Sequence, residues 1–219
     1  MSSTLMMTPS VNDHSLGFRL VVINRSVYTG DVTTTTRASA KADRRAALLA
    51  SAARLFAERG FDRVTLEDIG GAAGISGPAV YRHFPSKQAV LGAILLDASE
   101  GLLAGGRSVV EREPDAVVAL GELVAFHVDF AVANAAVIRV QDRDLDSLSD
   151  PDRGTVRALQ RTYVELWVDA LARLDPSAAT GELRARAHAG FGLMNSTPHT
   201  GRGATRGILE AMALAALRA

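Results

Sequence analysis

The residues with the clearest chemistry lie close together between positions 65 and 87. This stretch reads as two short helices, at about 66–73 and 77–84, joined by a turn at 74–76. Two helices with such a turn form a helix-turn-helix, whose second helix enters the major groove of DNA. Arg82 falls in the second helix, where its side chain is able to donate two hydrogen bonds to O6 and N7 of guanine. A contact to phosphate is the alternative role for Arg82.

The turn and capping residues agree with this interpretation. Thr65 is placed to accept from the backbone N–H groups that open the first helix, and Asp68 is placed to complete a capping box. Gly74 is able to take the left-handed conformation that ends a helix. Ser76 is the expected cap of the second helix, whose first turn tolerates Pro78.

A family resemblance enters at the end of the motif. Tyr81-Arg82-His83-Phe84 is followed by Pro85-Ser86-Lys87, and the helix before the motif reads AALLASAARLFAERGF. Over about residues 44–95 the chain resembles the TetR family of bacterial transcriptional regulators, because many fixed spacings agree at once. The resemblance covers about a quarter of the chain.

The resemblance implies which residues face DNA. Thr65, Tyr81 and Lys87 would contact phosphates, and His83 would contact a phosphate or pack against the first helix. Gly77 and Ala79 are small, so DNA shape and thymine methyl groups would supply part of the readout. The expected DNA-binding set is Thr65, Ser76, Gly77, Ala79, Tyr81, Arg82, His83 and Lys87.

The first helix of the motif departs from the family. Gly70-Gly71 stands where the family usually carries Ala, and each Gly costs roughly 1 kcal/mol against Ala inside a helix. If Leu66, Ile69 and Ala73 mark the buried side, Gly71 faces solvent and Gly70 lies nearer the second helix of the motif.

Composition limits the remaining possibilities. The chain has 219 residues and zero net charge. It has no Cys, which excludes disulfides and thiol chemistry and fits a reducing cytoplasm. The charge is unevenly distributed. Residues 37–90 hold nine Lys/Arg and five Asp/Glu, whereas residues 91–219 hold 13 and 17. A basic head on an acidic body suits a protein that presents one end to phosphate.

The hydrophobic pattern predicts an all-α fold. A helix is expected at about 42–59, and further helices at about 86–104, 114–134, 152–174, 177–195 and 204–219, with Gly105-Gly106 ending the first of these. The expected domains are a helix-turn-helix DNA-binding domain at 40–90 and a helical effector-binding and dimerisation domain at 91–219. Residues 1–39 show no helical period and read as a disordered arm. Two alternatives are a basic arm whose Arg37 and Lys41 reach phosphates or a minor groove, and translation starting downstream, at Val32.

The helical body also contains the large side chains from which an effector pocket would be built. Such pockets are mostly apolar with a few placed polar groups, and plain core packing is the alternative role for each residue. The candidates are Phe126, His127, Phe130, Tyr163, Trp167, Phe191 and Met194. The resemblance further implies a homodimer through the last two helices, with candidates Leu183, Ala187, Phe191, Met194, Ile208, Ala211, Met212 and Ala215.

Other kinds of site are disfavoured. The five His residues form no short pair, and Asp142-x-Asp144-x-Asp146 lacks the Gly and Glu of a calcium loop, so no metal is expected. GRGATRG at 201–207 lacks the spacing of a nucleotide-binding loop, so no cofactor is expected. The most apolar stretch, 123–140, is interrupted by charged residues, so no membrane span is expected.

These observations together favour a cytoplasmic, ligand-responsive regulator, most simply a repressor that a small molecule of unknown identity releases from a palindromic double-stranded operator. Two alternatives belong to other classes. One is an all-α enzyme with a coincidental helix-turn-helix, which the lack of a catalytic cluster disfavours. The other is a DNA-compaction protein without sequence preference, which would be basic throughout.

Overall fold

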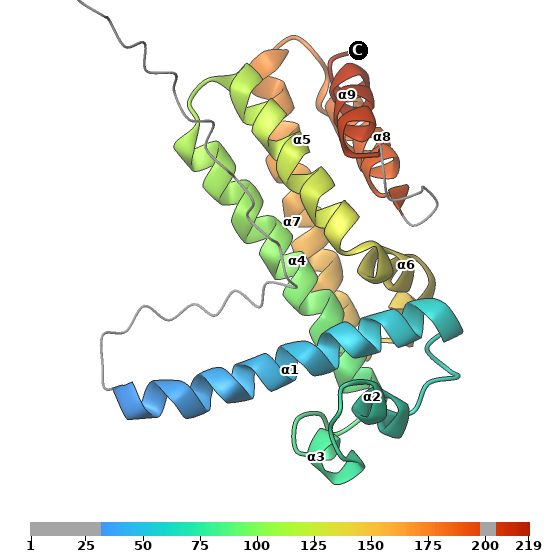
Figure 1. The fold of residues 1–219 in the computed structure, drawn as a ribbon. Helices are drawn as coiled ribbons and strands as arrows, with labels where there is room; N and C mark the ends of the chain where they lie inside the picture. The colour runs from blue at the N-terminus through green and yellow to red at the C-terminus, as the bar shows by residue number, and fades with distance from the viewer. Residues whose placement is uncertain (1–31, 198–204) are drawn as a thin grey trace, which may run out of the picture.

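A computed structural model describes residues 32–197 and 205–219, and the part of the chain that it describes is helical without strands (Figure 1). Its helices are α1 (Val32–Arg59), α2 (Leu66–Ala72), α3 (Gly77–Tyr81), α4 (Lys87–Arg112), α5 (Ala116–Ala133), α6 (Ala135–Asp144), the short 3-10 helix η1 (Leu145–Ser147), α7 (Asp150–Leu174), α8 (Thr180–Met194) and α9 (Thr205–Leu217). The all-α prediction is confirmed. Most of the expected N-terminal arm, residues 1–31, lies outside the described residues.

Helix α1 begins earlier than the sequence pattern indicated. It starts at Val32 rather than near residue 42, so the part of the expected arm at 32–39 is helical. No Gly or Pro interrupts the chain between Val32 and Arg59, which leaves the backbone free to continue the helix. The helix ends where expected, because Gly60 follows it with φ of 88°.

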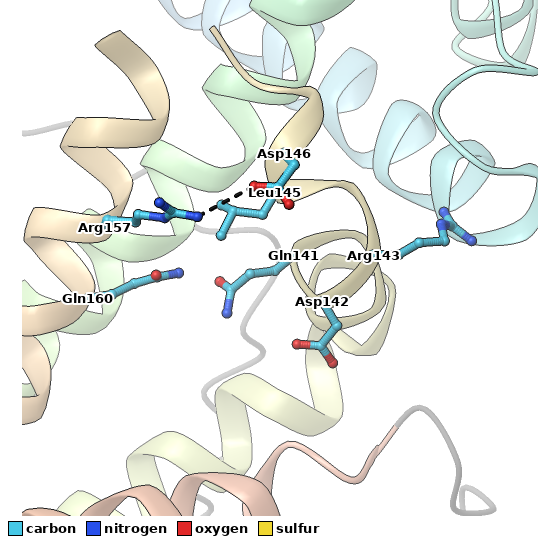
Figure 2. A pocket seen from close by; sticks show the side chains of 7 residues that line it. All are labelled: Gln141, Asp142, Arg143, Leu145, Asp146, Arg157 and Gln160. Atoms are coloured by element: carbon cyan, nitrogen blue, oxygen red, sulfur yellow. Dashed lines mark hydrogen bonds and ion pairs between the residues drawn. The ribbon is translucent and has the colours of Figure 1, made fainter. Parts of the chain in front are cut away.

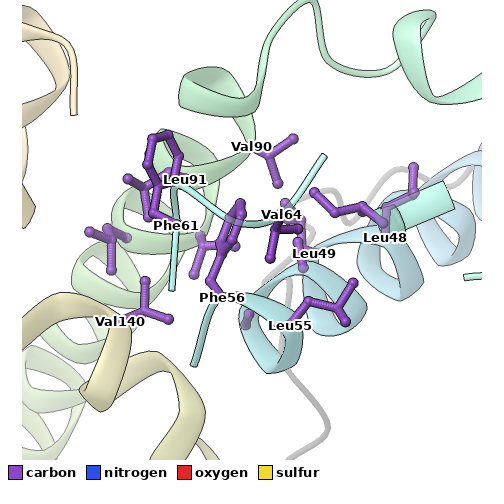
Figure 3. Close-up of a cluster of buried hydrophobic side chains, with 14 of the residues drawn as sticks. Leu48, Leu49, Leu55, Phe56, Phe61, Val64, Val90, Leu91 and Val140 are labelled. Carbon is purple, nitrogen blue, oxygen red and sulfur yellow. The ribbon is translucent and has the colours of Figure 1, made fainter. Parts of the chain in front are cut away.

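The helix-turn-helix has a core that it shares with the body. Phe56 of α1, Val80 of α3 and Leu91 of α4 belong to one buried cluster (Figure 3). The same cluster contains Val140 of α6 and Val156 of α7. The helix-turn-helix is therefore packed against the body through apolar side chains, and the division into domains at residue 90 stays a prediction.

Helix α4 corrects an expectation about glycine. It continues through Gly105-Gly106 to Arg112 instead of ending before them. The ring of Phe126 lies directly on Gly105, and a Cβ on Gly106 would come within 2.8 Å of Tyr163 Cε2. The two glycines let rings from α5 and α7 approach the α4 backbone, so their role is close packing rather than chain termination.

A second buried cluster fills the body. It joins α4, α5, α7, α8 and α9, with Trp167 at 0% exposure among its members. Helix α6 was not among the expected helices: α5 ends at Ala133, and residues 135–144 form a separate helix after Asn134. In Figure 1 this helix lies beside α1.

The two C-terminal helices pack against each other and expose a mixed surface. Of the residues expected in the dimer interface, Leu183, Ala187 and Met194 are buried inside the protomer instead. They are buried because this face of α8 packs into the second buried cluster. The small or apolar residues that the pair exposes include Ala185, Ala189 and Gly192 on α8, and Ile208, Ala211, Met212 and Ala215 on α9.

Two helices, α4 and α5, are long and apolar enough to cross a membrane by length and composition, although no such stretch was expected. Both contribute buried residues to the two clusters, and this packing inside the bundle accounts for their apolar composition. Figure 1 shows them among the other helices of the body.

The paired glycines of α2 generate a stability prediction. A Cβ on Gly70 would lie 2.7 Å from Val80 Cγ2 and 2.8 Å from the Ile75 carbonyl oxygen, whereas a Cβ on Gly71 would meet nothing within 4 Å. Gly71→Ala is expected to stabilise the protein by roughly 0.5–1 kcal/mol through helix propensity. Gly70→Ala is expected to destabilise it by about 1–3 kcal/mol through overpacking.

Urea unfolding of the three proteins measures both effects, with Gly71→Ala serving as the matched control for Gly70→Ala. A lower unfolding free energy for Gly71→Ala than for the parent protein would contradict the placement of these two residues.

Candidate nucleic-acid interface and effector pocket

The start of α2 is fixed by a capping box, as the sequence predicted. Thr65 Oγ1 accepts from the Asp68 N–H at 3.1 Å, and the Thr65 N–H donates to Asp68 Oδ2 at 2.8 Å. The Thr65 hydroxyl also donates to Asp68 Oδ2 at 2.7 Å. These hydrogen bonds with Thr65 lower the pKa of the Asp68 carboxyl. The Thr65 hydroxyl hydrogen is thus already engaged, and a phosphate would compete with Asp68 for it.

The turn between α2 and α3 depends on two glycines. Gly74 has φ of 67°, in the left-handed region where glycine carries no penalty, as predicted. The Gly70 carbonyl accepts from the Ile75 N–H at 2.8 Å, and the missing side chain of Gly70 lets Val80 of α3 approach. The backbone turn and the contact with Val80 together set the position of α3 against α2.

Ser76 corrects a smaller expectation. It occupies the N-cap position of α3, but its side chain makes no capping hydrogen bond. Pro78 lacks an N–H and Gly77 starts the helix, so the first turn offers few donors for a serine hydroxyl. Ser76 is exposed.

Two of the expected phosphate contacts are engaged within the protein. The Tyr81 hydroxyl donates to Glu67 Oε1 at 3.2 Å, which raises the pKa of the tyrosine. Lys87 Nζ donates to the carbonyl oxygens of Phe61 at 2.8 Å and Asp62 at 3.2 Å, and it lies 4.4 Å from the centre of the Phe61 ring. Lys87 therefore fastens the start of α4 to the loop after α1.

Arg82 differs from these residues. It follows α3 directly, it is exposed, and no ion pair or hydrogen bond of its side chain is found within residues 32–197 and 205–219. Its neighbours Ala79 and His83 are half-buried, and Phe84 is buried in the core of the head. Arg82 is thus a guanidinium free to bind an external acceptor, at the end of the molecule occupied by α3 in Figure 1.

The candidate pocket residues of the body do come together. His127, Tyr163, Trp167 and Phe191 are in mutual ring contact, with centroids 5.1–6.1 Å apart. The ring centroid of Phe130 lies 6.4 Å from that of His127, and Met194 is buried in the same cluster. Phe126 lies at the edge of this cluster, on Gly105.

His127 is the polar centre of this aromatic cluster. Its Nε2 lies 3.0 Å from Asn195 Oδ1, an acceptor, so the neutral ring carries its hydrogen on Nε2. Nδ1 then accepts from the Tyr163 hydroxyl at 3.2 Å. Burial lowers the pKa of His127 to about 4, against a smaller opposing effect of Asn195. Burial also raises the pKa of the Tyr163 hydroxyl.

Two pockets border the body helices. A groove of about 370 Å³ is lined by residues of α4 and α5, namely Gly105, Ser108, Val109, Arg112, Glu122, Ala125, Phe126 and Asp129. A second pocket, of about 300 Å³, lies between α6 and α7 and is lined by Gln141, Asp142, Arg143, Leu145, Asp146, Arg157 and Gln160 (Figure 2). Its ion pair, Arg157 with Asp146 at 3.4 Å, is largely exposed and therefore weak.

Sequence reasoning missed the role of Arg143. Figure 2 shows its guanidinium directed away from the second pocket. It donates to the carbonyl oxygens of Phe56 and, at 3.4 Å, Ala57, both in the last turn of α1. It also pairs with both oxygens of Asp144, at 2.9 and 2.8 Å. Asp144 belongs to the acidic run Asp142-x-Asp144-x-Asp146, yet its side chain is only 8% exposed.

The comparisons with known proteins agree with this geometry. The family described as bacterial regulatory proteins, tetR family, matches residues 48–94. The HTH-type transcriptional repressor KstR2 of Rhodococcus jostii (strain RHA1) is 33% identical over 134 residues, which cover 61% of this chain and 66% of the relative. The chain thus spans slightly less than two thirds of that relative's length.

Solved structures extend the likeness over most of the body. The TetR family regulator PfmR from Thermus thermophilus is 25% identical, with a TM-score of 0.70 over 80% of this chain and 95% of PfmR. A TetR-family regulator from Bordetella parapertussis 12822 has the same TM-score and identity and is covered to 92%. The comparisons support a TetR-family transcriptional regulator, because the family model matches the helix-turn-helix and the TetR-family structures share the fold over most of the chain.

The buried histidine gives a pH prediction. In the unfolded chain His127 binds a proton below about pH 6.5, whereas the folded protein resists protonation until about pH 4. The free energy of unfolding is therefore unaffected by this group above about pH 6.5, and it decreases as the pH falls from 6.5 toward 4. The expected loss is about 2–3 kcal/mol between pH 7.5 and 4.5.

Urea unfolding at these two pH values measures this loss, and His127→Gln serves as the control because its amide does not titrate. An equal loss of stability in the parent protein and in His127→Gln would exclude His127 as its source.

Proposed function

We propose that this protein is a homodimeric repressor that acts in the cytoplasm, binds a palindromic DNA operator through α3 and leaves it when a small molecule occupies the body. The observation that carries the proposal is the exposed, unpaired Arg82 beside a helix-turn-helix whose turn is set by Gly70 and Gly74. The match to the family model and the repressor at 33% identity support it.

In this proposal the DNA-binding residues have two kinds of role. Arg82 reads a base edge, because its guanidinium is free. Ser76, Gly77 and Ala79 allow close approach of α3, and Thr65, Tyr81, His83 and Lys87 border it. Tyr81 is already hydrogen-bonded to Glu67, and Lys87 to the loop after α1. The first role of these two residues is therefore to fix the relative positions of α2, α3 and α4.

The dimer forms through α8 and α9. Ile208 is 56% exposed and Met212 is 49% exposed on the outer face of α9. Ala185, Ala189 and Gly192 lie exposed on α8, where their small size permits close approach of a second helix pair. A symmetric dimer presents two α3 helices, as a palindromic operator requires.

Release of the operator requires a route from the effector pocket to the head. Helix α6 follows α5 directly, so the helix that carries His127 continues into the one that carries Arg143. Arg143 in turn holds the last carbonyls of α1. An effector acts on this route through its different affinities for two arrangements of α5 and α6, and operator binding reports which arrangement is populated.

The function is tested by selection of bound duplexes from a random DNA pool. The expected result is enrichment of one palindrome, whose affinity falls linearly in log–log plots as salt concentration rises. A DNA-compaction protein would enrich no sequence, and this outcome would overturn the proposal.

Arg82 should distinguish operator from random DNA. Arg82→Ala is expected to cost about 1–3 kcal/mol of binding free energy on the selected operator, and far less on a scrambled duplex. Fluorescence anisotropy measures both affinities. Arg107→Ala, the same charge change on an exposed residue of α4, is the control and should leave operator affinity unchanged. Equal losses on the two duplexes would show that Arg82 contacts phosphate only.

Arg143 should affect operator affinity, because it positions each helix-turn-helix against the body. Arg143→Met together with Asp144→Asn removes the contact without leaving a buried carboxylate unpaired. The double variant leaves the apolar cluster shared by the head and the body intact, so folding should survive. Operator affinity should fall at least tenfold, about 1.4 kcal/mol. Arg157→Met is the control, because its ion pair lies on the other side of α6; unchanged operator affinity in the double variant would exclude this route.

A further inference from the structure

The N-terminal segment of α1, residues 32–47, extends from the molecule without a packing partner. From residue 40 onward the first buried residue of this helix is Leu48, and every side chain between 40 and 47 is half-buried or exposed. In Figure 1 no other helix of the described residues lies beside these turns, which project at the end of the molecule that carries α2 and α3. A helical segment without a buried apolar face calls for a partner outside its own fold.

Arg45 shows which side of α1 meets the helix-turn-helix. Its guanidinium pairs with Asp97 of α4 at 2.8 Å and lies 5.6 Å from the centre of the Phe84 ring. Phe84 lies in the connection between α3 and α4, two residues after Arg82. The face of α1 that carries Arg45 is therefore directed toward α4 and the loop after α3.

Two cations continue this face toward the N-terminus of α1. Lys41 stands four positions before Arg45 and three before Arg44, and residues at these spacings are neighbours on a helix surface. Both Lys41 and Arg44 are exposed, and neither forms an ion pair or a hydrogen bond within residues 32–197 and 205–219. Asp43, the one acidic residue of the segment, does not share this face, because residues two positions apart point to different sides of a helix. Lys41 and Arg44 are thus cations available to an external anion.

Charge and position together identify the anion as nucleic-acid phosphate. The two cations lie on the face of Arg45, which contacts the loop after Arg82, so they continue the surface proposed to bind DNA. The segment measures about 24 Å from Val32 to Leu48 at 1.5 Å per residue. Successive phosphates of one strand are about 3.4 Å apart along the duplex axis, so the segment is long enough to extend past several of them.

We propose that the N-terminal segment of α1 binds the DNA backbone outside the half-site that α3 contacts, with Lys41 and Arg44 each neutralising one phosphate. The inference rests on the proposed function and adds a second DNA-contacting element to it. Contacts to phosphate position a protein without reading sequence, so this element lengthens the binding site and raises affinity while Arg82 keeps the sequence readout. The duplex also supplies the packing partner that the segment lacks in the protein alone.

Two duplexes that carry the selected palindrome test the inference. One ends at the palindrome, and the other continues on each side for about ten base pairs, one helical turn, of unrelated sequence. Fluorescence anisotropy at low salt should show the parent protein binding the longer duplex at least tenfold more tightly. Two residues on each of two protomers contact four phosphates, so the log–log salt slope should be steeper on the longer duplex by about 3–4.

Lys41→Gln combined with Arg44→Gln removes both charges and keeps good helix formers. This variant should bind the two duplexes with equal affinity and equal salt slope. Arg107→Gln combined with Arg161→Gln is the matched control, because it removes two exposed charges from α4 and α7 and should keep the parent's difference between the duplexes. The exchanged pair Lys41→Arg with Arg44→Lys keeps both charges and should also keep that difference.

Equal affinity of the parent protein for the two duplexes overturns the inference, and so does an unchanged difference in the glutamine variant. Light scattering without DNA tests the other occupant, a second copy of the chain: a smaller assembly for the glutamine variant than for the parent would assign the segment to a contact between copies and overturn the inference. The proposed function is judged separately. Failure to select any palindrome counts against that function, whereas a selected palindrome with equal affinity for both duplexes counts against the role of α1 alone.

Discussion

The buried cluster that α1 and α4 share with α6, together with the contact between Arg143 and the end of α1, is the constraint that positions the head on the body. A helix ends with carbonyl groups that have no partner within the helix and carry partial negative charge. Here a guanidinium from α6 donates to the carbonyl of Ala57 and also to that of Phe56, which accepts from the Gly60 N–H as well. Asp144 holds that guanidinium in place from the other side. The head is therefore attached to the body through α1, its first helix.

Apolar packing reinforces this attachment. Val137 and Val140 of α6 belong to the same buried cluster as Phe56 and Leu91, so the core of the head extends into the body (Figure 3). The aromatic cluster lies further along α5 and α7, in the second buried cluster. In the proposed function, a change at His127 is passed along α5 and α6 to Arg143, and from there to α1, which shares a buried cluster with α3. In the proposed function this geometry links ligand and operator.

Local features of the head were predictable from the sequence, because they depend on residues a few positions apart. The Thr65–Asp68 capping box, the left-handed Gly74 and the opposite environments of Gly70 and Gly71 follow from helix geometry alone. The clustering of His127, Tyr163 and Trp167 was expected from their size and type. The proposed contacts of the eight head residues with DNA stay predictions.

Features that depend on distant partners were not predictable in the same way. Gly105 and Gly106 look like a helix end until rings from α5 and α7 are seen to pack on them. Arg143 stands in a polar, acidic run, and nothing in its sequence neighbours indicates that the carbonyls of α1 lie within its reach. The inward face of α8 was misassigned because one amphipathic helix does not reveal whether its apolar side meets its own chain or a second copy.

In the proposed dimer, Arg143 fixes the two heads relative to the body. Because the chain has no cysteine, Ala72→Cys on the exposed end of α2 gives one spin-label site per protomer. Pulsed electron spin resonance of the dimer then measures the distance between the two heads. The account predicts one narrow distance distribution in the parent protein and a broad one when Arg143→Met and Asp144→Asn are combined. The same narrow distribution in both proteins would contradict it.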